Sequence, residues 1–226
     1  MKILLTGCCG FIGFNFANSL VKTNKKIKIV GIDNLNNYYS VGLKKARLKI
    51  LLKSKNFTFQ KMNLENLKLL NNLFKKNKFD CIFHLAAQAG VRYSIKNPKK
   101  YIDSNIIGFF NIIELAKKMN IKKIFYASSS SVYGDSKEFP LNEKTKINPK
   151  NIYGLTKKFN EELAEIYSNY YDINFIGLRF FTVYGEWGRP DMLISKYIEA
   201  SIKNKYFYLN NYGNHTRDFT YIDDVI

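Results

Sequence analysis

Residues 3–13 read ILLTGCCGFIG, an apolar run followed by Gly7, Gly10 and Gly13 at GxxGxxG spacing. Glycine permits a tight turn and lets backbone N–H groups approach a pyrophosphate at a helix N-terminus. The third glycine lets the following helix pack closely on the strand. A glycine pattern alone is weak support for a dinucleotide site. Here it opens a predicted strand–helix–strand unit, where the mechanism requires it.

The rest of the chain continues this alternation. Apolar runs predict strands at 3–6, 27–32, 57–62, 81–85, 123–127 and 174–179, and helical patterns fall at 11–22, 64–77, 99–119 and 151–170. This order predicts an α/β fold, a Rossmann-type doubly wound parallel sheet with helices on both faces. Ligands bind such sheets beyond the carboxyl ends of the strands. From about Gly185 the alternation stops, and a smaller irregular region is expected.

Composition narrows the function. The chain has 226 residues and a formal charge of +18, which invites a nucleic-acid role. However, its lysines are dispersed without a block of like charges, and we favour a solvated basic surface that attracts a small anionic substrate. Cys8, Cys9 and Cys81 form no disulfide framework, which indicates a reducing cytoplasm. We expect no membrane span, because no apolar run is long enough.

Tyr153 and Lys157 are candidates for acid/base chemistry. On a helix over 151–170 they lie one turn apart on one face. At about 5 Å and a dielectric of about 20, an ammonium would attract a phenolate by about 3 kcal/mol and lower the tyrosine pKa by about two units. Such a phenol can exchange a proton with an alcohol. The spacing is common by chance, however. One of the serines at 128–131 could hydrogen-bond a substrate oxygen beside Tyr153. Alternatively, these serines are only the polar residues at which the strand passes into a loop.

Other polar residues follow the strands. Asp33 ends the second strand, where a carboxylate binds an adenosine ribose and repels a 2′-phosphate, so NAD is favoured over NADP. Its alternative is a turn role beside Asn34. His84 is interpreted as structural, and His215 is isolated, so no metal site is expected. A packing role is at least as plausible for Arg179 as a ligand contact. Two further arginines are candidates for an anionic substrate, Arg189 and Arg217, the latter with Asp218 as a possible ion-pair partner.

At this point the sequence resembles the extended short-chain dehydrogenase/reductases of the NAD-dependent epimerase/dehydratase family. The resemblance rests on Thr6-Gly7 with the glycine loop, on Tyr153-x-x-x-Lys157 and on four longer segments: DNLN at 33–36, HLAAQAGVRYS at 84–94, the serine run with VYG at 132–134, and RDFTYIDD at 217–224. The segment LRFFTVYGEWGRPDM at 178–192 and residues 88–94 are similar to UDP-glucuronate 4-epimerases in particular.

The resemblance implies NAD-dependent 4-epimerisation of UDP-glucuronate to UDP-galacturonate through a transient 4-keto sugar, with cytoplasmic glycan biosynthesis as context. It implies catalytic roles for Ser129, Tyr153 and Lys157. On the cofactor side it implies Gly7, Gly10, Phe11, Ile12, Gly13, Asp33, Asn34, Asn63, Leu64, Leu85, Ala86, Ala87, Asn105, Tyr153, Lys157 and Phe180. On the substrate side it implies Arg92, Ser129, Thr182, Arg189 and Arg217.

Some points depart from the family or stay open. Asn63 stands where the family usually has Asp, and Ser130 and Ser131 replace the Asp-Glu pair of related dehydratases, which disfavours dehydration. Family members continue past the position of Ile226, so we expect an NAD-binding domain over 1–184 and a partial, truncated substrate lobe over 185–226. Alternatives are a neutral UDP-hexose 4-epimerase and an NAD-binding remnant without turnover. A UDP sugar is the expected partner, with no nucleic acid, no membrane and a possible homodimer.

Overall fold

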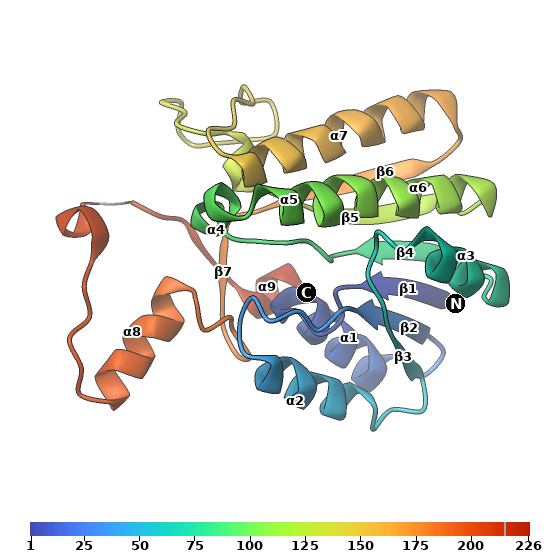
Figure 1. Cartoon of the computed structure of the whole chain (residues 1–226), viewed down its shortest axis with the longest axis horizontal. Coiled ribbons are helices and arrows are strands. Elements are labelled where there is room, and N and C mark those ends of the chain that lie inside the picture. The colour runs from blue at the N-terminus through green and yellow to red at the C-terminus, as the bar shows by residue number, and fades with distance from the viewer. Residues whose placement is uncertain (215) are drawn as a thin grey trace.

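The computed structural model describes residues 1–214 and 216–226 and confirms the α/β prediction. Six parallel strands form one sheet in the order β3-β2-β1-β4-β5-β6 (Figure 1). They are β1 (Lys2–Thr6), β2 (Lys28–Asp33), β3 (Phe57–Lys61), β4 (Cys81–His84), β5 (Lys123–Ser129) and β6 (Asn174–Phe180). This is the Rossmann order, in which β1 and β4 are neighbours at the point where the chain reverses direction across the sheet.

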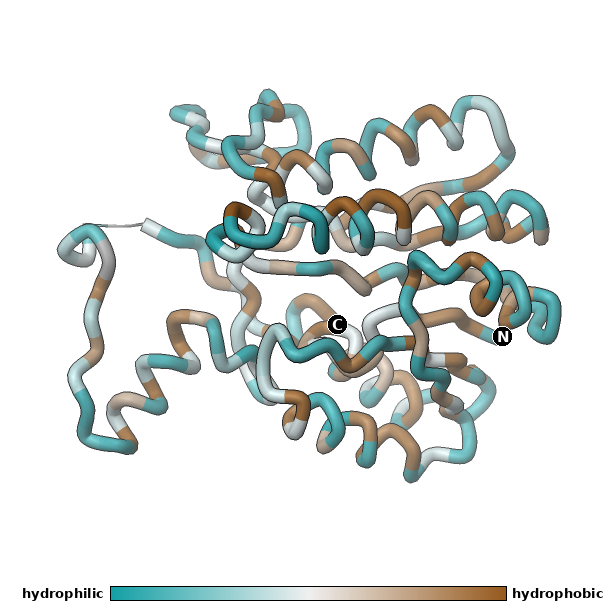
Figure 2. Tube along the Cα trace, in the orientation of Figure 1, coloured by the Kyte–Doolittle hydropathy of each residue, from teal (hydrophilic) through white to brown (hydrophobic). Residues whose placement is uncertain are grey.

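Helices cover both faces of the sheet. Helices α1 (Phe11–Thr23) and α2 (Val41–Leu51) lie on one face, and α3 (Leu67–Lys76), α6 (Gly108–Lys118) and α7 (Ile152–Tyr170) on the other. Strand β1 shows why two cores form. Ile3 and Leu5 pack into the apolar cluster beneath α1 and α2, whereas Leu4 joins the cluster under α3, α6 and α7. Alternate strand residues face opposite sides, and α7 alternates apolar and polar residues as a half-buried helix does (Figure 2).

The expected helix at 99–119 is interrupted. It consists of α5 (Pro98–Tyr101), a π-helical turn at Ile102–Ile107 and α6. Such turns are often found at functional sites. The turn contains Asn105, which is buried between the end of β4 and helix α7. Sequence periodicity did not reveal this turn, because a single inserted residue barely disturbs a helical pattern.

Before the C-terminal region, two helices were not expected: α2 and α4 (Val91–Lys96). Ser40 supplies the missing signal for α2, because its Oγ accepts a hydrogen bond from the Leu43 amide as an N-cap. Short 3-10 turns lie at Ser130–Val132 and Asn210–Gly213.

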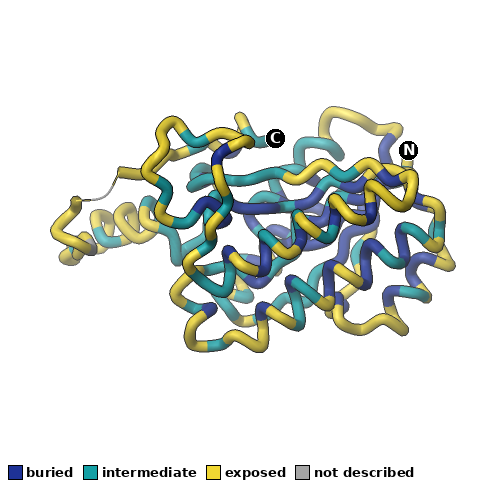
Figure 3. The backbone as a smooth tube through the Cα atoms, turned by 90° about the horizontal axis from the view of Figure 1, so that it is seen from above, coloured by how far each residue is buried: buried dark blue, intermediate teal, exposed yellow. Residues whose placement is uncertain are grey.

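The C-terminal region is more regular than predicted. Strand β7 (Thr182–Tyr184) pairs in parallel with β8 (Phe219–Tyr221), which leads into α9 (Ile222–Val225). Between them, α8 (Leu193–Ile202) extends away from the sheet and has no buried residue (Figure 3). Its apolar side chains Leu193, Tyr197, Ile198 and Ile202 are 47%, 58%, 50% and 80% exposed.

Among the helices of the described residues, none has the length and apolar character needed to cross a membrane.

Candidate active site

A cleft of about 1270 Å³ lies beyond the carboxyl ends of the central strands. Single ligand sites usually enclose about 300–1000 Å³, so this volume suits a dinucleotide together with a second ligand. Most of the residues predicted from the sequence line it. They are Gly7, Gly10, Phe11, Ile12, Gly13, Asp33, Asn34, Leu64, Leu85, Ala86, Ala87, Ser129, Tyr153, Lys157, Phe180, Thr182, Arg189 and Arg217.

The glycine loop forms the floor of the cleft. Gly7 has φ +71°, and a Cβ on it would lie 2.7 Å from the backbone nitrogen of Ala86. A Cβ on Gly13 would lie 2.3 Å from the carbonyl oxygen of Gly7. Larger residues at either position would therefore push the loop away from β4 or the helix away from the loop. The backbone at the start of α1 stays accessible to an anion, as a pyrophosphate site requires.

Asp33 has the turn role considered from the sequence, and it also lines the cleft. Its Oδ2 accepts a 3.1 Å hydrogen bond from the Cys9 amide, and its Oδ1 accepts one of 2.8 Å from the Leu35 amide. The carboxylate therefore braces the glycine loop and shapes the turn after β2. A carboxylate accepts about four hydrogen bonds, so capacity remains on the cleft side for ribose hydroxyls.

Lys157 is the buried cation of the site. Its side chain is 1% exposed, and its Nζ donates a 2.7 Å hydrogen bond to the carbonyl oxygen of Ala127 on β5. Burial lowers its pKa to about 8, while the Glu161 carboxylate opposes that shift. The ammonium lies 6.0 Å from the centroid of the Tyr153 ring.

The expected pKa of Tyr153 was wrong in direction. Burial raises it above its ordinary value, while a hydrogen bond from Ser129 and the positive charge of Arg189 oppose the rise. Helical spacing brought Tyr153 and Lys157 together as predicted. However, the ammonium is directed to the Ala127 carbonyl on β5, and the loss of solvent around the phenol outweighs the neighbouring charges.

Ser129 lies at the end of β5 beside Tyr153. It is buried, and its Oγ accepts a 3.2 Å hydrogen bond from the Ser131 amide, which starts the 3-10 turn. The hydroxyl thus has a fixed position, and it lies close enough to the Tyr153 phenol to oppose the rise in its pKa. Ser129 and Tyr153 line the same cleft, so the hydroxyl-partner interpretation of the serine run stays a prediction.

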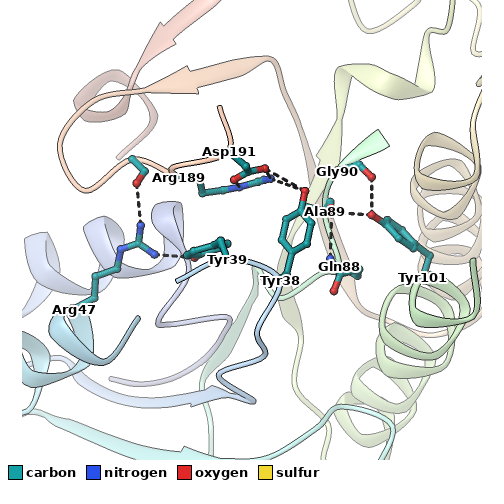
Figure 4. Close-up of polar contacts among 10 residues, drawn as sticks. Tyr38, Tyr39, Arg47, Gln88, Ala89, Gly90, Tyr101, Arg189 and Asp191 are labelled. Atoms are coloured by element: carbon teal, nitrogen blue, oxygen red, sulfur yellow. Dashed lines mark hydrogen bonds and ion pairs between the residues drawn. The ribbon is translucent and has the colours of Figure 1, made fainter. Parts of the chain in front are cut away.

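Arg189 is held on the opposite side of the cleft by Asp191 and Tyr38 (Figure 4). Its Nε donates to Oδ1 of Asp191 at 3.0 Å, and its Nη2 donates to Oδ2. The Tyr38 hydroxyl donates to the same Oδ2 at 3.1 Å. Burial and the Asp191 charge raise the pKa of Tyr38 to about 12, so this phenol remains a hydrogen-bond donor. Sequence reasoning identified Arg189 but neither of its two partners.

Arg47 was also missed. Its side chain is fully buried, and its Nη1 donates to the Cys9 carbonyl at 2.9 Å. The same Nη1 donates to the Tyr39 hydroxyl at 2.7 Å (Figure 4). Its Nη2 donates to the carbonyl oxygens of Trp187 and Gly188. One guanidinium therefore joins the glycine loop to the segment that carries Arg189. The sequence gives no signal for this, because the contacts span up to 141 positions.

Three predicted residues are not among those that line the cleft. Asn105 is buried and uses its amide on the backbone of Gln88, at 2.7 and 3.0 Å, and on Thr156 Oγ1 at 3.1 Å, so it fixes the end of β4 against α7. Asn63 is exposed beside the lining residues Met62 and Leu64, and Arg92 is exposed on α4. Their predicted contacts come from motif position, which does not determine where a side chain points.

The remaining polar residues are placed as follows. His84 is buried, its Nδ1 lies 3.1 Å from Thr6 Oγ1, and burial lowers its pKa to about 3, which confirms a structural role. His215 lies outside the described residues. Within residues 1–214 and 216–226 no group of three or more His, Cys, Asp or Glu side chains is arranged to hold a metal ion. Arg217 is exposed and lines the cleft.

Sheet order, glycine loop and the Ser129, Tyr153 and Lys157 arrangement together define a Rossmann-type, dinucleotide-dependent class of protein. The glycine loop, which lines the cleft together with Asp33, fits NAD. The chain belongs to the NAD dependent epimerase/dehydratase family, whose model matches residues 3–226.

Several similar proteins have names that state an activity on a nucleotide sugar. The chain is 49% identical over 227 residues to Protein CapI of Staphylococcus aureus, covering all of this chain and 67% of that protein. It is 43% identical over 231 residues to UDP-glucuronate 4-epimerase 4 of Arabidopsis thaliana, of which it spans about half, 52%. The structure matches that of UDP-glucuronic acid 4-epimerase from Bacillus cereus with UDP-glucuronic acid and NAD, with TM-score 0.93, 36% identity and coverage of 100% of this chain and 70% of that one.

Proposed function

We propose that the protein catalyses NAD-dependent 4-epimerisation of a UDP-hexuronate, interconverting UDP-glucuronate and UDP-galacturonate. One observation carries the proposal: a half-buried phenol, Tyr153, shares one cleft with the glycine loop and with the half-buried guanidinium of Arg189, whose side chain is 20% exposed. The phenol suits proton transfer at a sugar hydroxyl, the loop suits a dinucleotide, and the guanidinium suits a carboxylate. The similarity to UDP-glucuronate 4-epimerases supports the same assignment.

The cofactor side is formed by the glycine loop and the end of β2. We assign the pyrophosphate to the backbone between Gly7 and Gly13, and the adenosine ribose to Asp33. Leu64, Ala86 and Phe180 line the path of the rings. When bound, NAD supplies the acceptor and donor of the hydride at the sugar C4. The carboxylate of Asp33 disfavours a 2′-phosphate, which selects NAD over NADP.

Proton transfer falls to Tyr153. It takes the proton of the 4-hydroxyl as C4 is oxidised, and returns it after the 4-keto sugar has turned over in the cleft. Ser129 hydrogen-bonds the same oxygen and stabilises the phenolate. Lys157 binds the nicotinamide ribose and places a positive charge behind the phenol. Burial raises the Tyr153 pKa. The positive charges of Lys157 and Arg189 are therefore needed to stabilise the phenolate near neutral pH.

On the substrate side, Arg189 binds the uronate carboxylate, and Thr182 also lines the cleft. Arg189 is already paired with Asp191, so the substrate carboxylate shares this guanidinium rather than meeting a free charge. Arg217 is exposed at the rim and is assigned to the UDP phosphates. Residues 185–226 therefore supply the two arginines assigned to the anionic groups of the substrate, and residues 1–184 supply the cofactor site and the acid/base residues.

The direct test incubates the purified protein with UDP-glucuronate and no added NAD, and follows the 4-epimer by NMR. Turnover is expected, because the cofactor is regenerated in each cycle. Tyr153→Phe should lose turnover while NAD binding persists, and Tyr170→Phe, which changes a 79% exposed tyrosine on the same helix, should behave as wild type. Full turnover by Tyr153→Phe would refute the assignment of the base.

Two alternatives have distinct outcomes. A neutral UDP-hexose as substrate predicts that Arg189→Met leaves affinity nearly unchanged, whereas a uronate predicts a loss of about tenfold or more. An NAD-binding protein without turnover predicts cofactor binding and no change in any UDP sugar.

We also propose a homodimer through α7 and the neighbouring helix. Leu155, Phe159 and Ile166 lie on one face of α7 and are 56%, 37% and 51% exposed, and Phe110 on α6 is 44% exposed. Surface helices rarely leave such a stripe uncovered. Light scattering should give twice the mass of the chain, and Phe159→Glu should halve it. A wild-type monomer at micromolar concentration would contradict the proposal.

A further inference from the structure

Glu161 lies one helical turn after Lys157 and two turns after Tyr153, so the three side chains share one face of α7. Its side chain is only 14% exposed. Acidic side chains are seldom this buried unless they are paired or serve a site. Glu161 is not among the residues that line the cleft, so any role it has in the chemistry acts through other groups.

The Glu161 carboxylate has three donors on two strands. Arg179 binds it with two parallel hydrogen bonds, Nε to Oε1 at 3.0 Å and Nη2 to Oε2 at 2.8 Å. Ser128 Oγ donates to the same Oε1. Ser128 and Arg179 are register partners on β5 and β6, so one carboxylate fixes both strands where they end at the cleft. Ser128 directly precedes Ser129.

Arg179 extends the same brace to the loop after β5. Its Nη1 donates to the Tyr133 hydroxyl and to the Glu143 carbonyl, both at 3.1 Å, and its guanidinium lies 5.0 Å from the centroid of the Tyr133 ring. The serine run at 128–131 is therefore held at its start by Glu161 and beyond its end by Arg179.

The charges around Lys157 give Glu161 a second effect. The titratable groups that face Lys157 or its carboxylate neighbour are His84 from β4, Tyr126 from β5, Arg179 from β6, and Tyr153 and Glu161 from α7. His84 is neutral because burial lowers its pKa to about 3, and burial raises the pKa of Tyr126 so that it too is neutral. Glu165, one turn further along α7, is exposed and acts on Tyr126, whereas Glu161 is the carboxylate that acts on Lys157.

We propose that Glu161 is a positioning residue of the epimerase site, which fixes the serine run through Ser128 and keeps the buried Lys157 in its ammonium form. The catalytic importance of this role rests on the proposed function, whereas the effect of Glu161 on Lys157 concerns only residues of this chain. The Lys157 pKa of about 8, set by burial and opposed by Glu161, agrees with it. A purely structural ion pair between Glu161 and Arg179 is the competing explanation.

Two substitutions separate these explanations by the sign of their effect. Glu161→Gln keeps the hydrogen-bond acceptor and removes the charge, so the pKa of Lys157 should fall by about one unit or more. Arg179→Met leaves the Glu161 charge unopposed, so the same pKa should rise. Loss of packing cannot produce opposite shifts from two partners of one ion pair. Glu162→Gln, which removes an exposed carboxylate from the same helix, should produce no shift.

The readout is the titration of Lys157 in protein labelled with carbon-13 lysine, with the resonance assigned through Lys157→Arg. It requires neither sugar nor turnover, so it stands if the proposed activity fails. A second readout is NAD affinity against pH, in which the decline at alkaline pH should begin earlier in Glu161→Gln. A lower Lys157 pKa in Glu161→Gln and a higher one in Arg179→Met support the proposal. If only one of the two variants folds, the direction of its Lys157 pKa shift decides. Unchanged titration in either variant would overturn it.

Discussion

The carbonyl oxygen of Cys9 accepts a 2.9 Å hydrogen bond from Nη1 of the fully buried Arg47, which fixes the glycine loop to helix α2. The same guanidinium bonds to the carbonyl oxygens of Trp187 and Gly188. The cofactor side and the segment before Arg189 therefore depend on one side chain.

Replacement of this side chain should damage both regions. Arg47→Met leaves the Cys9 and Trp187 carbonyls without their donor, and we expect a loss of about 3 kcal/mol in unfolding free energy. NAD affinity should fall as well. Urea unfolding and NAD titration measure the two effects. Lys49→Met, on the exposed side of α2, is the matched control and should change neither. A stable Arg47→Met protein with normal NAD affinity would contradict this account.

Glycine at position 13 is required by contact rather than by backbone conformation. Gly13→Ala would place a Cβ 2.3 Å from the Gly7 carbonyl oxygen, so we expect NAD binding to be lost and the melting temperature to drop. Gly42→Ala is the control. Its Cβ would meet Ser40 Oγ at an ordinary 3.5 Å inside α2, and alanine there should stabilise the protein by about 0.5–1 kcal/mol. Equal effects from the two substitutions would rule out the contact argument.

His84 should make the protein sensitive to acid. Its pKa is about 3 in the folded protein and 6.5 ordinarily, so below pH 6.5 the unfolded chain binds a proton that the folded protein does not. Its contribution to stability is complete above pH 6.5 and falls by about 1.4 kcal/mol per pH unit toward the folded pKa. His84→Asn should flatten the stability profile between pH 6 and 4 in denaturant titrations. Parallel profiles for the two proteins would disprove the assignment.

The exposed apolar face of α8 should bind hydrophobic dyes. Ile198 and Ile202 are adjacent on the helix and are 50% and 80% exposed. Ile198→Ser with Ile202→Ser should reduce dye fluorescence without lowering the melting temperature, because neither residue is buried. Leu52→Ser, which removes a 54% exposed apolar residue elsewhere, should change the fluorescence little.

Features that depend on short stretches of sequence were predicted correctly: the strands of the main sheet, the glycine loop and the spacing of Tyr153 and Lys157. Apolar runs located all six strands of the main sheet, and the glycine loop predicted a cofactor site at their carboxyl ends. Helical spacing brought Tyr153 and Lys157 into one cleft. The α2 helix was missed because its sequence, VGLKKARLKIL, has a weak apolar face, although Ser40 marks its start.

What the sequence did not predict depends on the direction of side chains and on solvent. Arg47 contacts the Trp187 carbonyl and Tyr38 contacts Asp191 across more than a hundred positions, with no spacing to reveal either contact. Asn105 matched a motif position, yet its amide is used by Gln88 and Thr156. The predicted shift in the Tyr153 pKa was wrong in direction. The prediction counted the positive charge of Lys157 but not the loss of solvent around the phenol, which raises the pKa.

The two backbone hydrogen bonds of Asp33 constrain how this enzyme class can be redesigned. An engineer who seeks NADP dependence would remove this carboxylate to admit the extra phosphate. Here that change also removes the acceptor for the Cys9 and Leu35 amides, so the glycine loop loses a support that has nothing to do with ribose. A switch of coenzyme preference at this position therefore requires a compensating acceptor for those amides, such as serine or asparagine, and an added cation alone will not achieve it.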